Sequence, residues 1–146
     1  ILRTTVMVGF PEETEEEFQE LYDFLKEARF DKLGAFAYSK EEGTPAEKMP
    51  NQVHPQTKKS RYHKVMSLQQ EISKENLQEK LGQKYEIMIE GITKNEKYYV
   101  GRSYMDTPEI DGVVYIQNTK RLQTGEFVTC KITDMKEYDL VGELVD

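Results

Sequence analysis

Few side chains in this 146-residue sequence belong to the types that usually carry chemistry. The candidates for a nucleophile or a soft metal ligand are one cysteine, Cys130, and two histidines, His54 and His63. A catalytic nucleophile needs an activating base beside it, and a metal centre needs several such ligands at fixed spacing. These three residues show neither pattern. The sequence therefore predicts no metal site and no catalytic residue, and we expect Cys130 to pack as a small apolar side chain.

Acidic residues and a glycine near the N-terminus form the next candidate site. Thr14 and Glu17 have the spacing of a capping box, and acids at a helix start are stabilised by the helix dipole, which explains the acidic run over 12–17. Gly9 is different, because a glycine between a strand and a helix lets backbone amides approach an anionic ligand closely. Such a turn is more often structural, and both interpretations stay open here.

The elements around Gly9 are predicted to follow the order strand, helix, strand. An apolar stretch over 6–8 precedes the turn, and apolar residues recur at helical spacing over 18–28. This helix should end near Arg29. A second apolar stretch over 32–38 predicts the next strand, and this order of elements usually gives two parallel strands.

A long loop and a second helix complete the first half. Residues 39–56 contain Gly43, three prolines and scattered charge and predict an ordered or semi-ordered loop, and apolar spacing predicts a helix from about 56 to 80. The sequence begins within a strand and without methionine, so we expect a fragment of a larger protein. Two strands and two helices leave one sheet face for further strands to cover, and we do not expect residues 1–82 to fold alone.

From residue 83 onward the hydrophobic pattern alternates, as it does in half-buried strands. Five strands are predicted, over residues 85–90, 98–104, 112–116, 126–132 and 139–145. Closure into a barrel protects a small isolated sheet from edge pairing. The predicted fold is therefore an α/β unit over 1–82, followed by an all-β, five-stranded antiparallel barrel over 83–146.

Composition excludes several classes of protein. The chain has 27 acids against 20 bases, a net charge of −7, and no apolar run near the ~18 residues that cross a membrane. Its first residues lack the basic start and apolar core of a signal peptide. One cysteine cannot form an internal disulfide, so reducing cytoplasm is the expected compartment. We expect no membrane partner.

Charge also bears on the partner of the barrel. The barrel half has six tyrosines, which could stack on bases or serve as core and cross-strand contacts. Residues 84–146 hold 8 lysines and arginines against 12 aspartates and glutamates, a net charge of −4. Nucleic-acid binding needs a basic surface, whereas an acidic surface attracts a basic protein. We therefore expect a protein partner and no nucleic acid.

Three stretches of the sequence resemble one enzyme family. Residues 8–14, Val-Gly-Phe-Pro-Glu-Glu-Thr, resemble a turn late in the barrel of the radical S-adenosylmethionine methylthiotransferases, and residues 38–46 are similar to the segment after the next strand. Residues 100–115 resemble the terminal TRAM barrel of the branch that modifies a ribosomal protein, not the branch that modifies transfer RNA. One departure is Glu12, where the family commonly has glycine. The resemblance covers nearly the whole chain but only about the last third of the family's length.

The resemblance implies an activity that this chain carries only in part. The family branch methylthiolates the β-carbon of an aspartate on a small-subunit ribosomal protein, the S-twelve protein, using S-adenosylmethionine and two 4Fe-4S clusters. The clusters are held by a Cys-x3-Cys-x2-Cys motif and by three cysteines of an N-terminal domain, and this sequence has neither set. The fragment should hold no cofactor and be inactive by itself. Residues 1–82 would end an open radical S-adenosylmethionine β/α barrel, and residues 83–146 would form the OB-like TRAM barrel.

The resemblance also implies the position of two sites. Gly9 and Phe10 are expected near bound S-adenosylmethionine. The candidates for the surface that docks the ribosomal protein are Arg102, Asp106, Glu109 and Asp111. In that role the acids would face basic side chains of the ribosomal protein, and Arg102 would fix the loop. Alternatively, all four residues only stabilise the long turn between the second and third predicted strands. A barrel that binds transfer RNA and a barrel that merely caps the catalytic domain are the two alternative functions.

Overall fold

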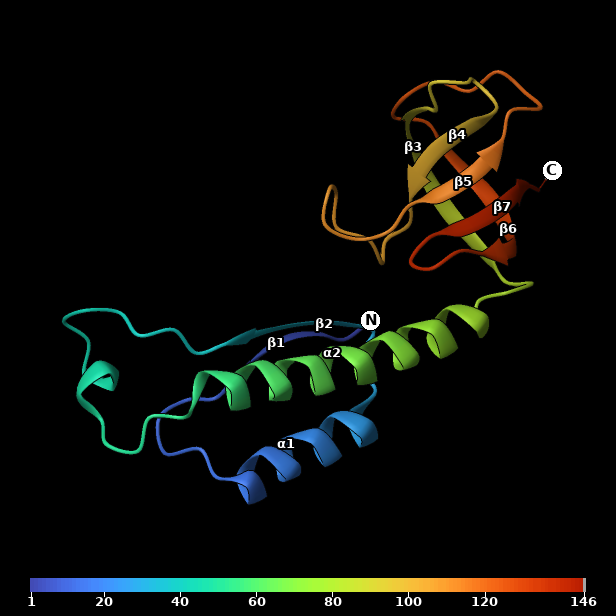
Figure 1. The fold of residues 1–146 in the computed structure, drawn as a ribbon. Coiled ribbons are helices and arrows are strands. Elements are labelled where there is room, and N and C mark those ends of the chain that lie inside the picture. Colours follow the sequence, from blue (N-terminus) through green and yellow to red (C-terminus); the bar gives the residue numbers. More distant parts are fainter. Residues whose placement is uncertain (146) are drawn as a thin grey trace. The chain divides into compact units, whose positions relative to one another are not determined.

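The computed structural model describes residues 1–145 and divides into two compact units, residues 1–73 and residues from 74 onward. We call them the α/β unit and the barrel unit. The division falls within the long helix α2. The elements of the first part (Figure 1) are β1 (Arg3–Val8), α1 (Glu15–Ala28), β2 (Lys32–Ala37), the 3-10 helix η1 (Ala46–Lys48) and α2 (Pro55–Gln78).

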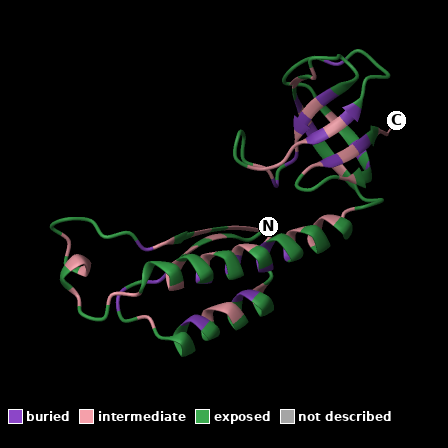
Figure 2. Ribbon diagram, in the orientation of Figure 1, coloured by how far each residue is buried: buried purple, intermediate pink, exposed green. Residues whose placement is uncertain are grey.

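Strands β1 and β2 form a two-stranded parallel sheet, as the sequence predicted, with Val6 opposite Ala35. Side chains alternate across this sheet. One face packs with both helices around a core of Val8, Phe18, Leu25, Val65, Leu68 and Ile72. The other face carries Met7 and Phe36, which are 41% and 49% exposed and lie opposite each other in the register. One face of the sheet is therefore left uncovered within this unit (Figure 2).

Helix α1 is specified by local interactions at both ends. Oγ1 of Thr14 accepts a hydrogen bond from the amide of Glu17 at 3.1 Å, and the Glu17 carboxylate accepts one from the amide of Thr14 at 2.9 Å. The predicted capping box is thus confirmed. The helix ends at Ala28, and Arg29 follows in a left-handed conformation with φ of 48°. Short-range contacts of this kind make a helix predictable from sequence.

The barrel unit contains five strands that close into a ring in the order β3-β4-β5-β7-β6. They are β3 (Lys84–Ile92), β4 (Tyr98–Arg102), β5 (Val114–Gln117), β6 (Phe127–Met135) and β7 (Leu140–Leu144). The predicted five-stranded barrel is confirmed, but the prediction that it is antiparallel throughout is wrong, because β5 and β7 are parallel with Tyr115 opposite Val141. Directions cannot alternate around a closed ring with an odd number of strands, so one neighbouring pair must be parallel.

Alternate residues of the strands fill the barrel. The buried core consists of Ile87, Ile89, Tyr99, Val114, Ile116, Leu122, Cys130, Ile132 and Leu140. Cys130 is fully buried, as predicted for a small apolar side chain, and burial raises the pKa of its thiol to about 11. The Tyr99 hydroxyl accepts a hydrogen bond from the amide of Leu122 at 3.1 Å, which satisfies a polar group at the edge of the core.

Among residues 1–145, neither α-helix is apolar enough over a sufficient length to cross a membrane.

Candidate cofactor turn and docking loop

The turn between β1 and α1 is built around Glu13. Gly9 has φ of 73°, a left-handed conformation that favours glycine, and its amide donates a hydrogen bond to Oε1 of Glu13 at 2.9 Å. A Cβ at this position would clash with Cγ of Lys58, so the Lys58 side chain covers the glycine. The glycine is therefore required by the turn itself, and its amide already has a protein acceptor.

Helix α2 holds this turn through Arg61, which is 5% exposed. Nη1 of Arg61 donates to Oε1 of Glu13 at 2.7 Å and to its carbonyl at 3.2 Å, and Nη2 donates to Glu15 at 3.1 Å. The guanidinium also lies 5.4 Å from the centre of the Phe18 ring. Sequence reasoning did not single out Arg61, because it contacts residues more than 40 positions earlier in the chain.

The side chain of Phe10 is the apolar part of the turn that is exposed to solvent. Its side chain is 41% exposed, and its ring packs edge to face against Tyr38 with 5.3 Å between ring centres. Lys58 supports Tyr38 by donating to its carbonyl at 3.0 Å. The turn therefore offers an exposed aromatic ring, while its Gly9 amide is already bound by Glu13. A ring suits a sulfonium cation such as that of S-adenosylmethionine, so the fit to this cofactor rests on Phe10.

The described residues do not fit an iron-sulfur cluster. Such clusters are held mainly by cysteine thiolates, and the one cysteine lies fully buried inside the barrel. Across residues 1–145, no three His, Cys, Asp or Glu side chains are placed to bind a metal ion. No step of cluster chemistry can be assigned to this part of the chain.

Three of the four docking candidates lie in the loop between β4 and β5, residues 103–113, which we call the docking loop. Oδ2 of Asp106 accepts from the amide and the hydroxyl of Ser103 at 3.2 and 2.8 Å. Oδ2 of Asp111 accepts from the amide of Thr107 at 2.6 Å. Both carboxylates therefore help to fold the loop. Glu109 is exposed, and its side chain has no hydrogen bond or ion pair with any residue of 1–145.

The fourth candidate, Arg102, lies at the end of β4 and points to the neighbouring strand. Its Nε donates to Oε1 of Glu90 on β3 at 2.7 Å, and both side chains are about one-third exposed. Arg102 therefore joins β4 to β3. The loop itself is held by its own aspartates and, at its end, by Asp139, which accepts a hydrogen bond from the Val113 amide at 2.9 Å.

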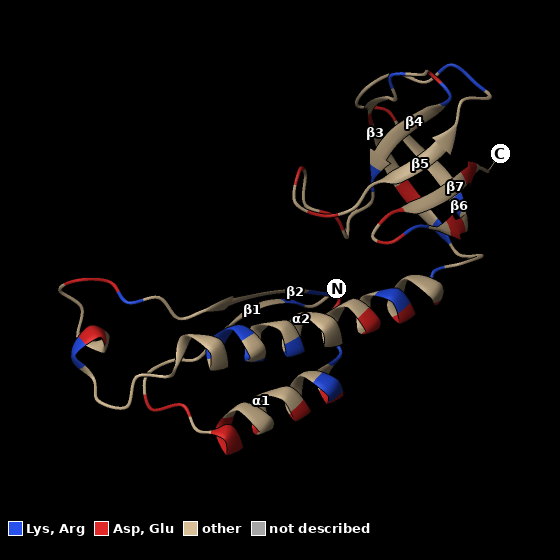
Figure 3. Cartoon of the chain, viewed as in Figure 1, with Lys and Arg blue, Asp and Glu red and all other residues tan. Residues whose placement is uncertain are grey.

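The docking loop also presents two apolar side chains that sequence reasoning did not select. Tyr104 is 78% exposed and Ile110 is 74% exposed. They accompany Glu109 on a loop along which acidic residues gather (Figure 3). Ile110 lies among turn-forming residues, whereas Tyr104 was assigned to the end of the predicted strand over 98–104, which in the structure ends at Arg102. The loop thus combines exposed apolar groups with negative charge.

Comparisons with known proteins place the chain in a family. Residues 81–145 match the family model described as TRAM domain. The chain is 57% identical over 145 residues to a ribosomal protein uS12 methylthiotransferase of Alkaliphilus oremlandii, covering 99% of this chain and 33% of that protein. Proteins of the same name from Desulforamulus reducens and Clostridioides difficile are 51% and 47% identical over 99% of this chain, and it covers 33% and 32% of them.

The chain spans about a third of the length of the curated relatives that it matches. Its similarity to them extends through both units and is not confined to the barrel. Residues 81–145 are a TRAM domain, and the chain as a whole corresponds to the C-terminal third of the ribosomal protein uS12 methylthiotransferases.

Proposed function

We propose that this chain is the C-terminal part of an enzyme that transfers a methylthio group to the β-carbon of an aspartate on ribosomal protein uS12. The observation that carries the proposal is the similarity over 99% of the chain to relatives named for that activity. In the complete enzyme, S-adenosylmethionine and iron-sulfur clusters supply the radical and the sulfur chemistry. The cluster ligands belong to other parts of that enzyme, because this chain has a single, buried cysteine.

Residues 1–82 would close the catalytic barrel in that enzyme. The uncovered sheet face with Met7 and Phe36 supports this role. Further strands of the barrel would bury these exposed apolar side chains, and that burial would stabilise the folded enzyme. Gly9 and Phe10 would lie beside bound S-adenosylmethionine. Phe10 would contact it through its exposed ring, and Gly9 would shape the turn that presents the ring.

Residues 83–146 would dock the ribosomal protein through the docking loop. Tyr104 and Ile110 provide apolar contact area, and Glu109 provides negative charge for a basic partner. Asp106 and Asp111 would act by holding the loop in shape, and Arg102 by fixing the strand before it. Protein docking is favoured over transfer-RNA binding by the net charge of −4 on residues 84–146.

The test is to remove residues 83–146 from the full-length enzyme and to follow methylthiolation of uS12 by mass spectrometry. A docking module predicts that KM for the intact protein rises while kcat on a short peptide around the aspartate is retained. A structural cap predicts lower stability and a loss of activity on both substrates. Methylthiolation of transfer RNA by the intact enzyme, with none of uS12, would contradict the proposal.

A further inference from the structure

A basic stretch interrupts this acidic chain. Residues 48–70 contain five lysines and arginines and two histidines but no aspartate or glutamate, whereas the whole chain has a net charge of −7. Most of the stretch lies in the first half of α2, where basic residues follow one another along the helix (Figure 3). Charge that is concentrated in this way produces a local positive field even on an acidic protein.

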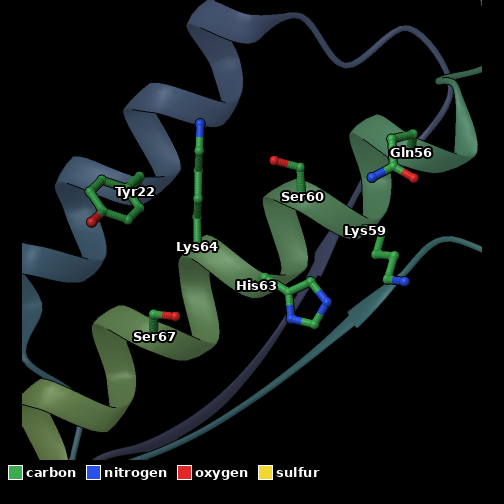
Figure 4. A pocket seen from close by; sticks show the side chains of 7 residues that line it. All are labelled: Tyr22, Gln56, Lys59, Ser60, His63, Lys64 and Ser67. Atoms are coloured by element: carbon green, nitrogen blue, oxygen red, sulfur yellow. The ribbon is translucent and has the colours of Figure 1, made fainter.

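An open groove lies against this part of α2, with a volume of about 450 Å³. Helix α1 contributes Tyr22 to it, and α2 contributes Gln56, Lys59, Ser60, His63, Lys64 and Ser67. Gln56, Ser60, His63 and Ser67 are spaced by four, three and four residues, which places them on a single helix face. Figure 4 shows Lys64 reaching toward α1 beside Tyr22. We call this site the α1–α2 groove.

The polar groups of the α1–α2 groove are not occupied by protein partners. Lys58 and Arg61, on the same helix, are used to hold Tyr38 and Glu13. Lys59 and Lys64, by contrast, form no ion pair with any of residues 1–145, and Lys64 only approaches the Phe18 ring at 5.9 Å. The side chains of Ser60 and Ser67 have no hydrogen-bond partner within the same residues. The groove therefore presents two cations and several donors to solvent.

Aromatic rings accompany these donors. Tyr22 is half-buried in the wall of the groove with Lys26 placed 5.3 Å from its ring centre, and His63 is exposed beside Tyr62. Cations that neutralise phosphates, neutral donors to phosphate oxygens and rings that stack on bases are the three components of a single-strand nucleic-acid site. An acidic peptide would use the cations but leave the rings without a matching group.

We propose that the α1–α2 groove binds the sugar–phosphate backbone of single-stranded RNA, with Lys59 and Lys64 contacting phosphates and Tyr22 stacking on a base. This inference goes beyond the proposed function, which gives the barrel unit a protein partner. The RNA site lies in the α/β unit, which as a whole has 10 lysines and arginines against 13 aspartates and glutamates, so the positive charge is local to residues 48–70. Its test needs no catalysis, so it can fail while the proposed function holds, and the reverse is equally true.

The experiment measures binding of a fluorescent 20-nucleotide unstructured RNA to the full chain by anisotropy at 50, 100 and 200 mM KCl. The groove variant is Lys59→Gln/Lys64→Gln, and the matched control is Lys94→Gln/Lys97→Gln, which removes the same charge from the exposed β3–β4 hairpin. Each phosphate contact on a single strand contributes about 0.7 to the slope of log affinity against log salt. The groove variant should therefore have a slope about 1.4 shallower than that of the control.

In practical terms, the control should lose about sevenfold more affinity than the groove variant between 50 and 200 mM KCl. Tyr22→Leu should weaken binding at every salt concentration without changing the slope, because stacking releases no counterions. Equal slopes for the two double variants would overturn the proposal. Displacement of the RNA by poly-glutamate as effectively as by unlabelled RNA would overturn it as well, because the groove would then select charge alone.

Discussion

Arg61 of α2 and Glu13 of the turn before α1 form an ion pair of 2.7 Å between side chains that are only 6% and 14% exposed. The same Glu13 oxygen accepts the hydrogen bond from the Gly9 amide. One carboxylate thus links the glycine turn to a helix that begins more than 40 residues later. The conformation of the turn that presents Phe10 therefore depends on α2.

The first prediction concerns this pair. Arg61→Met removes the cation and leaves the buried Glu13 carboxylate uncompensated, so we expect a loss of about 3–5 kcal/mol in the free energy of unfolding. Urea denaturation followed by circular dichroism measures it. Lys74→Met, an exposed change on the same helix, is the control and should stay within about 0.5 kcal/mol of the wild type. The double variant Glu13→Gln/Arg61→Met should recover part of the loss, and a double variant as unstable as the sum of both single changes would contradict this account.

A second prediction tests how closely two barrel strands approach. A Cβ at Gly101 on β4 would lie 2.5 Å from Cγ2 of Ile87 and 2.7 Å from the carbonyl oxygen of Met88 on β3. Gly101→Ala should therefore lower the free energy of unfolding by about 1–3 kcal/mol through overpacking. Gly91→Ala is the matched control, because no atom lies within 4 Å of its added Cβ. Equal stability of the two variants in urea would show that β3 and β4 do not approach in this way.

The third prediction concerns pH. Burial raises the pKa of the Cys130 thiol from its ordinary value of 9.0 to about 11. Between these values the unfolded chain releases this proton while the folded barrel keeps it, so the free energy of unfolding falls as pH rises from about 9 to 11 and is unaffected below pH 9. The variant Cys130→Ala has no thiol, so its free energy of unfolding should lack this fall between pH 9 and 11. Urea unfolding at pH 8, 9.5 and 10.5 should show the two proteins converging as pH rises, and parallel profiles would contradict burial of the thiol.

The fourth prediction separates folding of the docking loop from its charge. Asp106→Asn keeps an oxygen acceptor for Ser103, whereas Asp106→Ala leaves the amide and the hydroxyl of Ser103 without it. We expect faster hydrogen exchange of the Ser103 amide in Asp106→Ala than in Asp106→Asn, measured by NMR. Similar exchange rates in both variants would mean that the carboxylate does not hold the loop.

Elements specified by neighbouring residues were predictable from the sequence. Helix α1 follows from Thr14 and Glu17, which satisfy each other's backbone and side-chain groups across three residues. The parallel pairing of β1 and β2 follows from a helix between two short apolar stretches. The barrel was predicted because its five apolar stretches alternate in hydropathy, and closure protects their edges.

Features that depend on distant residues were not predictable in the same way. The parallel pair β5 and β7 results from closure of the whole ring, a property that no single stretch of sequence carries. The role of Arg61 depends on how α2 lies against the turn. Asp106 and Asp111 could be selected as acids near a loop, but only their geometry shows that both bind backbone amides. The α1–α2 groove requires the pairing of two helices whose sequences are far apart.

The central claim is that the docking loop binds the ribosomal protein, and the most direct test is the affinity of uS12 for the full-length enzyme by isothermal titration calorimetry. The variant is Tyr104→Ser/Glu109→Gln/Ile110→Ser, and the control is Ile92→Ser/Glu96→Gln, which changes an exposed apolar group and an exposed acid elsewhere in the barrel. Loss of anchor contacts predicts an affinity at least about tenfold weaker for the loop variant, with the control unchanged. An affinity for uS12 that is the same in the loop variant, the control and the wild type would contradict the claim.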